Sequence, residues 1–431
     1  MIDQCLVLAD TTGALAKLCG ISVLERLLRT LQRCGFRTAI VLARNGDAIQ
    51  GEIARPPRPR DQIAVTVREK EHGPVMIKEI VDLWPKGEEL LLVLRGDTVF
   101  DDRLLRLLAT QTRSAVLVDR TPPPDLQKLV GSAPEMAGAK YCGAAVLNNN
   151  WAEGQAGTFE ESLHTGLAKQ HFAEVDVAAQ PLYSPAIRRD LRPFWFAAPA
   201  PSEKILAERL LLHSIQKGAP DFPAWVHAPI ENFLIARLCK TSITPNQLTI
   251  FCNVVAWMTT ILFFTGRLYC GVALALIVGV LDGLDGKQAR IKVETSKGGK
   301  LEHWFDALFE WSWWTALAYH FQISGQLPGA FRYWLLLLAA ETLDGLAKGG
   351  VFLTTGKVID ELGAFERFVR LLGGRRNVYV WILTIGFLWG EPAKAFIVMA
   401  WWEAITAAVH LPLAARAVYR FRKQAHVRAT I

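Results

Sequence analysis

The sequence predicts a soluble α/β domain with an open sheet, followed by an all-α domain of six transmembrane helices. The first observation is a change in polarity along the chain. Residues 1–240 mix charged and apolar side chains, whereas residues 248–415 contain long apolar runs separated by short basic loops. The second observation is composition, because 51% of the residues are apolar and 14 are Trp, which is many for a soluble chain. A length of 431 residues allows roughly two or three domains of ordinary size.

Apolar runs of strand length alternate with a helical pattern in the first half of the chain. This alternation is typical of an open α/β sheet covered by helices. The strand-like runs span residues 5–9, 38–43, 63–67, 90–94 and 115–118, and the helical run spans residues 23–34. From residue 120 to residue 225, Pro- and Ala-rich stretches predict irregular loops. We therefore expect the α/β domain to cover residues 1–200 and a linker to follow over residues 201–227.

Six apolar segments follow in the second half, most of them near the length that a helix needs to span a membrane. They cover residues 248–265, 268–285, 302–320, 333–353, 377–390 and 394–415. Before them, residues 228–247 place apolar side chains at helical spacing among Arg237 and Lys240. This pattern predicts an amphipathic helix lying along the membrane surface. The six-helix membrane domain is expected to occupy residues 248–431.

Loop charge predicts the orientation of these helices. The loops at 287–300 and 354–376 and the tail after residue 415 contain five Lys or Arg each, whereas the three opposite turns contain one each. Basic loops stay on the cytoplasmic side of a membrane. The first ten residues also lack the basic start and long apolar core of a signal peptide. We therefore expect a multi-pass protein of the inner (cytoplasmic) membrane, with its N-terminal domain and its C-terminus in the cytoplasm.

Net charge and cysteine usage narrow the expected partners. The formal charge is +7, and the excess Lys and Arg residues lie beside apolar runs, which favours anionic lipid headgroups over nucleic acid. The seven cysteines show no CxxC or other metal-binding spacing. We expect them to be small apolar fillers in a reducing compartment.

Four acidic residues stand at the end of the second apolar segment and the start of the third. Asp282 and Asp285 are three residues apart and Glu302 and Asp306 are four apart, so each pair shares a helix face. Carboxylates within apolar segments are costly and mark function. On adjacent antiparallel helices the two pairs can converge near the cytoplasmic edge, where they would repel one another without a cation. Oxygen ligands of this kind suit Mg²⁺, Mn²⁺ or Ca²⁺.

Small and basic residues accompany these acids. Gly283 and Gly286 remove side chains where a ligand or a second helix must approach closely. Arg290, about one turn further along, is placed to hold a phosphate by a bidentate contact. Arg375 and Arg376 open the fifth segment, where they either bind an acceptor phosphate or serve as basic anchors at the membrane edge.

Further polar residues lie within the apolar segments. Glu341, Asp344 and Lys348 share one face of the fourth segment, and we expect them either to pair with one another or to contact the substrate. Glu310 follows Asp306 by four residues and is expected to line the same cavity.

The segment around these acids resembles the signature of the CDP-alcohol phosphotransferase family, which reads D-x-x-D-G-x-x-A-R, a spacer, then G-x-x-x-D-x-x-x-D. The first half matches at every defined position, namely Asp282, Asp285, Gly286, Ala289 and Arg290. The run I-T-P-N-Q-L-T before the first segment also resembles the family. The resemblance covers about residues 220–431, half of the chain.

The second half of the signature departs from the family pattern. With Gly298 as its glycine, the spacer is shorter than in the family, and Glu302 stands where the family has Asp, followed by Asp306. Aligning Gly299 instead restores the spacer but puts His303 and Ala307 at the acidic positions, so we prefer the first alignment. Glu keeps the charge with one more methylene, so the geometry of a bound metal is expected to shift.

This resemblance implies roles for the site residues. Asp282, Asp285, Glu302 and Asp306 would hold Mg²⁺ or Mn²⁺ at the donor pyrophosphate, and Asp306 would also be the general base that deprotonates the acceptor hydroxyl. Five positions would bind the CDP part of the donor: Asp282, Gly283, Gly286, Ala289 and Arg290. CMP would be the leaving group, and homodimers are common in the family.

The first half of the chain resembles sugar-nucleotide cytidylyltransferases in the stretches LVLADTTGALAK, ISVLERLLRTLQRCGF and VLRGDTVFDDRLLRLL. Of that family's nucleotide-binding loop, Gly13 and Lys17 remain. Asp97 stands where the family holds a metal ion, and Asp176 is a candidate second ligand. Some archaeal enzymes that make and use CDP-inositol join the same two domains in this order. We expect the nucleotidyltransferase-like domain to be degenerate.

Three functions are compatible with these patterns. The leading prediction is a membrane transferase that moves a phosphoalcohol or phosphatidyl group from a CDP-alcohol to a hydroxyl acceptor, in phospholipid or polar phosphodiester synthesis. An alternative is a bifunctional enzyme that also makes the CDP-alcohol from CTP. The alternative of another class is a transporter or flippase that uses intramembrane carboxylates, which predicts acids near the middle of the bilayer.

Overall fold

The computed structural model describes residues 2–54, 60, 62–70, 73–131, 133–218, 221–294 and 299–429, without side-chain surroundings for residues 299–305 and 425–429. The chain divides into two compact units. The first unit comprises Met1–Gln216, Cys239–Thr241 and Ala289–Thr295, and the second comprises Lys217–Leu238, Ser242–Gln288 and Ser296–Ile431.

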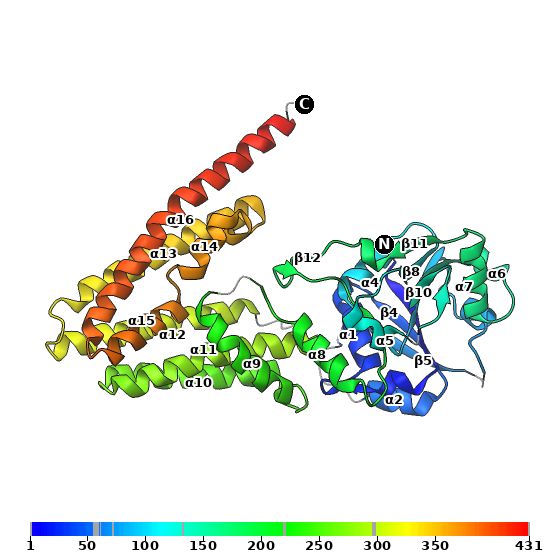
Figure 1. Ribbon diagram of the computed structural model, residues 1–431, viewed down its shortest axis with the longest axis horizontal. Helices are drawn as coiled ribbons and strands as arrows, with labels where there is room; N and C mark the ends of the chain where they lie inside the picture. Colours follow the sequence, from blue (N-terminus) through cyan, green and yellow to red (C-terminus); the bar gives the residue numbers. More distant parts are fainter. Residues whose placement is uncertain are drawn as a thin grey trace. The chain divides into compact units, whose positions relative to one another are not determined.

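A mixed β-sheet forms the centre of the first unit (Figure 1). Its strand order is β11-β8-β10-β6-β1-β4-β5, and β9 pairs with β10. Strand β1 is parallel to both β4 and β6, whereas β10 runs antiparallel to β6 and β8. The strands are β1 (Gln4–Ala9), β4 (Thr38–Ala43), β5 (Ala64–Glu69), β6 (Leu90–Arg95), β8 (Ala115–Asp119), β9 (Glu135–Met136), β10 (Ala139–Asn148) and β11 (Ala173–Asp176).

Helices cover both faces of this sheet. Alternate side chains of β1 enter opposite cores, since Cys5 and Val7 pack in one cluster and Leu6 in the other. The first core takes side chains from α1 (Val23–Cys34), α4 (Asp102–Ala109), α5 (Pro124–Val130) and α8 (Lys204–Ser214). The second takes them from α3 (Ile77–Asp82), α6 (Asn149–Glu153) and α7 (Phe159–Ala168). The sequence therefore predicted the α/β class correctly.

Shorter elements complete the first unit. They are η1 (Thr12–Leu15), β2 (Lys17–Leu18), β3 (Ile21–Ser22), α2 (Gly46–Ala54), β7 (Thr98–Phe100), η2 (Val177–Ala179), β12 (Tyr183–Ser184), β13 (Arg189–Asp190) and β14 (Trp195–Ala197). Helix α1 begins where Ser22 accepts a hydrogen bond from the Glu25 amide, and it ends at Gly35, which has φ of 96°. Both are standard helix ends, because Ser satisfies a free amide and Gly adopts the left-handed conformation without strain.

The prediction of irregular structure over residues 120–225 was wrong. The ten-residue strand β10 crosses the middle of the sheet, and five helices and η2 also lie in this region or begin in it. The pairing of β10 with β8 shifts register between Tyr141 and Ala145, around Gly143, which has φ of 81°. This bulge interrupts the alternation of side chains, so the strand has no regular pattern in the sequence.

The segments expected as a linker and a surface helix are also largely helical. Helix α8 lies within residues 201–227, and α9 (Pro223–Leu238) begins in the same segment. The next helix starts at Pro245, with Thr244 accepting a hydrogen bond from the Gln247 amide. The surface helix expected over residues 228–247 therefore corresponds to α9 in its first half only.

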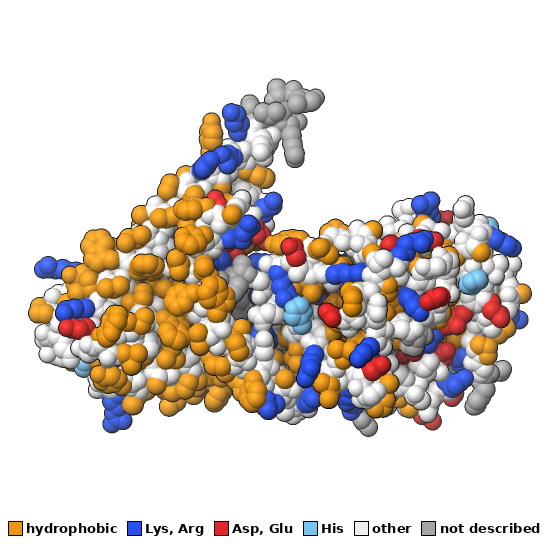
Figure 2. All heavy atoms as spheres, viewed as in Figure 1, with side chains coloured by type: hydrophobic (Ala, Val, Ile, Leu, Met, Phe, Trp, Pro, Cys, Tyr) orange, Lys and Arg blue, Asp and Glu red, His pale blue; other side chains and the backbone are white. Residues whose placement is uncertain are grey.

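Seven further helices make up most of the rest of the described second unit. They are α10 (Pro245–Phe264), α11 (Leu268–Ile291), α12 (Gly299–Ile323), α13 (Ala330–Thr355), α14 (Ala364–Leu372), α15 (Arg376–Leu388) and α16 (Pro392–Ala429), with the short η3 (Ile359–Glu361) after α13. Aromatic side chains such as Phe263, Trp313 and Phe396 fill the core between them. Large apolar side chains, among them Ile261 and Leu353, are exposed on the outside. Figure 2 shows hydrophobic side chains gathered over this unit.

Six of these helices correspond to the six predicted membrane segments. Among the described residues, α10, α11 and the Pro392–Gln424 part of α16 are long and apolar enough to cross a membrane, and α15 is apolar but shorter. Helices α12 and α13 carry charged side chains within their apolar sequences, including Asp306 and Lys348. The structure thus confirms the helical class, whereas by length and composition it supports three spans.

Candidate functional site

A cavity of about 420 Å³ opens among the helices of the second unit. Its lining comes mainly from α11, α12, α13, α15 and α16. Among the described residues, seven carboxylates and three cations line it: Asp221, Asp282, Asp306, Glu310, Glu341, Asp344 and Glu403, with Lys348, Arg375 and Arg376. Acids in this excess favour a bound cation, because close carboxylates repel one another in a site of low dielectric constant. We call this the acid-lined cavity.

Two acids of the signature line this cavity from different helices. Asp282 lies on α11, and Asp306 lies on α12. An Asp282 oxygen, Oδ2, is 2.6 Å from an Arg376 nitrogen at the start of α15. The Arg376 guanidinium also lies 5.0 Å from the centre of the Phe309 ring. The arginine therefore neutralises part of the acidic charge beside the signature.

Asp285, the other signature acid of α11, forms a different set of contacts. Its side chain is buried, and the Thr249 hydroxyl donates to its Oδ2 atom at 2.7 Å. Thr249 belongs to the I-T-P-N-Q-L-T run on α10. The contact therefore links the two stretches of sequence that carry the family resemblance.

The remaining signature positions of α12 lie at the edge of the described structure. Gly298 is outside the described residues, and Glu302 and His303 belong to the part of α12 whose side chains are not described. Among the described residues, no three His, Cys, Asp or Glu side chains are grouped closely enough to hold a metal ion. The aspartates that are described offer only oxygen ligands, which are the type that Mg²⁺ and Mn²⁺ prefer.

The signature glycine Gly283 allows helix α9 to approach α11. A Cβ atom on Gly283 would lie 2.5 Å from the carboxyl group of Glu231. Glu231 is buried and pairs with Lys287 at 2.9 Å, and Lys287 also donates to the Asn232 side chain at 2.6 Å. The expectation that a second helix comes close at this glycine is met by α9.

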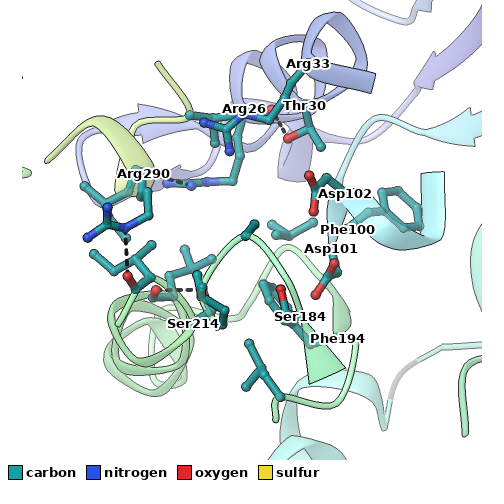
Figure 3. A pocket seen from close by; sticks show the side chains of 18 residues that line it. Arg26, Thr30, Arg33, Phe100, Asp101, Asp102, Ser184, Phe194, Ser214 and Arg290 are labelled. Atoms are coloured by element: carbon teal, nitrogen blue, oxygen red, sulfur yellow. Dashed lines mark hydrogen bonds between the residues drawn. The ribbon is translucent and has the colours of Figure 1, made fainter. Parts of the chain in front are cut away.

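The last two residues of the first signature half, Ala289 and Arg290, belong to the first unit. Arg290 Nε donates to the Ile215 carbonyl at 2.8 Å, and Arg290 lines a separate cavity (Figure 3). Asp282 and Asp306 line the acid-lined cavity instead. The structure thus does not bring Arg290 into one described cavity with them, and its role in donor binding stays a prediction.

Polar residues of α13, α15 and α16 form the other wall of the acid-lined cavity. Asp344 pairs with Lys348, as one of the two sequence interpretations expected, and His410 Nδ1 lies 2.6 Å from Asp344. The Tyr379 hydroxyl donates to Glu403. Sequence reasoning missed Tyr379, Glu403 and His410, although Glu403 is a carboxylate inside an apolar segment and that signal alone marks it.

In the first unit, Asp97 is held by a network of protein groups. Arg95 contacts both oxygens of the Asp97 carboxylate, at 3.1 and 3.2 Å, and also pairs with Glu160 at 2.8 Å. The Thr11 hydroxyl donates to Asp97 at 2.7 Å. Burial favours the neutral form of Asp97, but the hydrogen bonds and charge of Arg95 outweigh it and hold the pKa of Asp97 below its ordinary value.

The two candidate ligands of the first unit are not neighbours. Asp97 follows β6, whereas Asp176 ends β11, and two strands separate β6 from β11 in the sheet. Three strand spacings amount to about 14 Å, which is too far for both to hold one metal ion. The Asp176 carboxylate accepts instead from the Ala178 amide at 2.9 Å. In the remnant of the loop, a Cβ on Gly13 would lie 2.9 Å from Ala198, so little space remains there.

Comparison with known proteins identifies the class of the helical unit. Residues 242–409 match the CDP-alcohol phosphatidyltransferase family. The C-terminal half of the chain therefore contains a CDP-alcohol phosphatidyltransferase domain, which confirms the resemblance drawn from the signature.

Two relatives are both named "Bifunctional IPC transferase and DIPP synthase". The one from Rubrobacter xylanophilus is 30% identical over 212 residues, which cover 47% of this chain and 44% of the relative. The one from Aquifex aeolicus is 25% identical over 212 residues, covering 48% of this chain and 47% of the relative. The matches thus span less than half the length of these relatives.

Solved structures resemble each half of the chain at low identity. A phosphatidylinositol phosphate synthase of Mycobacterium tuberculosis with CDP-DAG bound has a TM-score of 0.35 and 19% identity, covering 44% of this chain and 94% of that chain. The inositol-1-phosphate CTP transferase from T. maritima has a TM-score of 0.34 and 11% identity, covering 48% of this chain and 96% of that chain. A UDP-glucose pyrophosphorylase complexed with UDP-glucose has a TM-score of 0.37 and 10% identity, covering 50% of this chain and 100% of that chain.

Proposed function

We propose that this protein is an integral-membrane enzyme that transfers a phosphoalcohol or phosphatidyl group from a CDP-alcohol to an acceptor hydroxyl and releases CMP. One observation carries the proposal. Within the region that matches the family, Asp282 of the signature helix and Asp306 of the next helix line one acid-lined cavity. Transfer from a CDP-alcohol needs a group that neutralises pyrophosphate charge and a base that activates the hydroxyl, and carboxylates at such a cavity can serve both needs.

The proposed roles follow the chemistry of the side chains. Asp306 accepts the proton of the acceptor hydroxyl as that oxygen attacks the phosphorus of the donor. Asp282, Asp285, Glu302 and Asp306 would hold Mg²⁺ or Mn²⁺, which would supply positive charge at the donor pyrophosphate. The surplus of carboxylates over cations in the cavity supports this assignment.

Binding of the substrates is proposed for the neighbouring positions. Gly283, Gly286, Ala289 and Arg290, with Asp282, hold the CDP part of the donor. Arg375 and Arg376 bind a phosphate of the acceptor, and both line the acid-lined cavity. Arg376 is paired with Asp282. When a phosphate binds to Arg376 and a cation binds to Asp282, these two contacts would replace the ion pair.

We place the protein in the inner membrane with both termini in the cytoplasm, in contact with membrane lipids and as a homodimer. The sidedness is supported by the basic loops, each with five Lys or Arg. The alternative of a transporter or flippase is disfavoured because residues 242–409 match a family of transferases.

The bifunctional alternative concerns the first unit. The names of the two relatives favour it, since both describe two activities. The Arg95–Asp97 pair and the separation of Asp97 from Asp176 favour a degenerate domain that does not use CTP. CTP-dependent release of pyrophosphate by the purified chain would support the bifunctional alternative, and its absence in a chain that releases CMP would support a degenerate domain.

The transfer reaction is tested by measuring CMP release from the purified, detergent-solubilised chain. CDP-diacylglycerol, CDP-inositol, CDP-choline and CDP-glycerol are offered in turn, with Mg²⁺ or Mn²⁺ and a mixture of hydroxyl acceptors. We expect metal-dependent release with at least one donor and a loss of about 100-fold or more in Asp306→Asn, because a general base contributes about that much.

A matched control is Glu391→Gln, which removes an exposed acid that pairs with Lys394 outside the cavity. Its rate should equal that of the unaltered chain. Folded protein that releases no CMP from any donor would overturn the proposal.

A further inference from the structure

A second cavity, of about 130 Å³, lies entirely within the first unit (Figure 3). Its walls come from α1, from the start of α4, from the residues around β12, from the end of α8 and from residues 290–293. We call it the arginine cavity, because Arg26, Arg33 and Arg290 line it. It is a different cavity from the acid-lined one.

Arg26 is a buried cation without a carboxylate partner in the described part of the chain. Only 4% of the residue is exposed. Its two terminal nitrogens donate to backbone carbonyls, Nη1 to Ile291 at 2.7 Å and Nη2 to Leu18 at 3.2 Å. Its Nε atom is buried and has no hydrogen-bond partner among the described groups. Within the described residues, the hydrogen bonds of this positive charge thus go to neutral carbonyl oxygens.

The neighbouring Arg29 shows the usual arrangement for a buried arginine. Arg29 Nε pairs with Glu25 at 2.8 Å, and Nη1 lies 3.4 Å from Glu294. The charged or titratable groups that influence Arg26, one helical turn earlier on the same helix, are Arg29 and the thiols of Cys19 and Cys239. Burial accordingly lowers the pKa of Arg26, with a further contribution from Arg29. Burying a charge without a counter-ion is costly, and an anion in the cavity would offset that cost.

The acids that line the arginine cavity do not supply this counter-charge. Asp101 pairs with Arg103 at 2.8 Å, and Asp102 lies 3.6 Å from Arg106. Figure 3 shows Arg26 and Arg290 lying toward one side of the cavity, across from Asp101 and Asp102. Because each of these two acids has an arginine of its own outside the cavity lining, neither is the counter-ion of Arg26.

Guanidinium groups bind phosphate through parallel N–H···O contacts and keep their charge when buried. Hydroxyl groups of Ser184 and Ser214 add polar lining, and Phe100, Phe194 and Leu211 add apolar lining for the carbon part of a ligand. We propose that the arginine cavity binds the phosphate group of a small phosphate monoester, with Arg26 supplying the buried positive charge. Since Arg290 is also a signature position, this site contacts the segment that completes the first half of the signature.

Binding is measured by titration calorimetry on the full-length, detergent-solubilised chain without a CDP-alcohol, so the result does not depend on turnover. The probes are inorganic phosphate, glycerol 3-phosphate and CMP. A fourth arm uses micelles that contain phosphatidic acid, with phosphatidylcholine micelles as its reference. We expect saturable binding of at least one soluble phosphate, which would distinguish a free ligand from a lipid headgroup.

Two substitutions locate the binding. Arg33→Gln, at a half-buried position, should weaken it at least tenfold, because contacts to a charged group contribute about that much. Arg26→Gln should abolish the binding component that Arg33→Gln weakens. If Arg26→Gln does not fold, Arg33→Gln decides alone. Arg37→Gln is the matched control, since this arginine has 83% of its side chain exposed and lies in the same region.

A third substitution separates the two cavities. Arg376→Gln alters the acid-lined cavity, where we propose that an acceptor phosphate binds, so it should weaken any binding component of that cavity and leave the component that Arg33→Gln weakens. The proposal would be overturned if no soluble phosphate binds saturably, if Arg33→Gln binds as tightly as the unaltered chain, or if binding is lost only in Arg376→Gln. Binding restricted to phosphatidic acid would likewise overturn it in favour of a lipid headgroup.

Discussion

Each unit of the molecule pairs an aspartate with an arginine, and the surroundings of the two pairs differ. In the first unit, Arg95 holds both Asp97 and Glu160, and Thr11 donates to Asp97 as well. In the second unit, Arg376 holds Asp282 within a cavity lined by six further carboxylates and two further cations. In the first pair, the charges of Asp97 and Arg95 are nearly balanced by other groups of the protein. The second is left with acids in excess, which a bound cation would neutralise, and this contrast favours chemistry in the second unit.

The largest expected effect separates the two aspartates directly. Asp282→Asn should lower CMP release by about 100-fold or more, the size associated with losing a group that positions or stabilises charge at a reaction centre. Asp97→Asn should leave the rate unchanged, because its carboxylate is neutralised by Arg95. Initial rates of CMP release with saturating metal give both values. Equal losses in the two variants would mean that the first unit takes part in transfer and would remove the contrast.

A smaller effect, on stability, is expected from a substitution at the contact between α9 and α11. Gly283→Ala would place a methyl group 2.5 Å from the Glu231 carboxyl group, so Glu231 must move and weaken its pair with Lys287. We expect a loss of about 1–3 kcal/mol in the free energy of unfolding, as for other overpacked positions. Thermal unfolding in detergent, followed by Trp fluorescence, measures it.

Gly349→Ala is the control for that substitution. A Cβ at Gly349, inside α13, meets nothing within 4 Å. The change should therefore be neutral or stabilising by up to about 1 kcal/mol, because Ala favours a helix more than Gly does. A Gly283→Ala chain as stable as the Gly349→Ala chain would show that α9 does not hold this position in solution.

The smallest expected effect concerns how the stability of the first unit depends on pH. Arg95 outweighs burial and lowers the pKa of Asp97 in the folded chain, so ionised Asp97 stabilises the fold above the unfolded pKa of 3.8. This contribution is lost as the pH falls through the lower folded pKa. Asp97→Asn should reduce the melting temperature near neutral pH by about 2–4 °C, and the difference should shrink as the pH falls below 3.8.

The exposed Asp47 on α2 provides the reference for this measurement. Asp47→Asn should leave the melting temperature unchanged at every pH at which the chain stays folded. A difference between Asp97→Asn and the unaltered chain that persists undiminished in acid would contradict the proposed charge balance at Asp97.

The strands and the signature could be predicted because each is a pattern of residues that are close together in the sequence. The runs 5–9 and 38–43 are continuous apolar stretches, and they form β1 and β4. Asp282 was singled out with Asp285 on one segment and Asp306 with Glu302 on the next, each pair by its helical spacing, and Asp282 and Asp306 line one cavity. Local patterns therefore identified the elements and two residues of the acid-lined cavity, whose roles stay predictions.

What the sequence did not reveal depends on contacts between distant segments. Glu231 lies about fifty residues before Gly283, and only the packing of α9 on α11 brings them together. Strand β10 was missed because its bulge at Gly143 disturbs the side-chain alternation. The cysteines were expected to be buried fillers, and six are, but Cys270 is exposed on the apolar helix α11.

Helix α16 contains 38 residues, which correspond to about 57 Å of continuous helix. The hydrocarbon layer of a bilayer is only about 30 Å thick. A crossing by the apolar first part of α16 therefore leaves several turns, including Arg416, Arg420 and Arg422, in the headgroup layer or beyond it. In a thicker or thinner membrane α16 would still cross the hydrocarbon layer, because its surplus turns change only how much basic helix lies outside that layer.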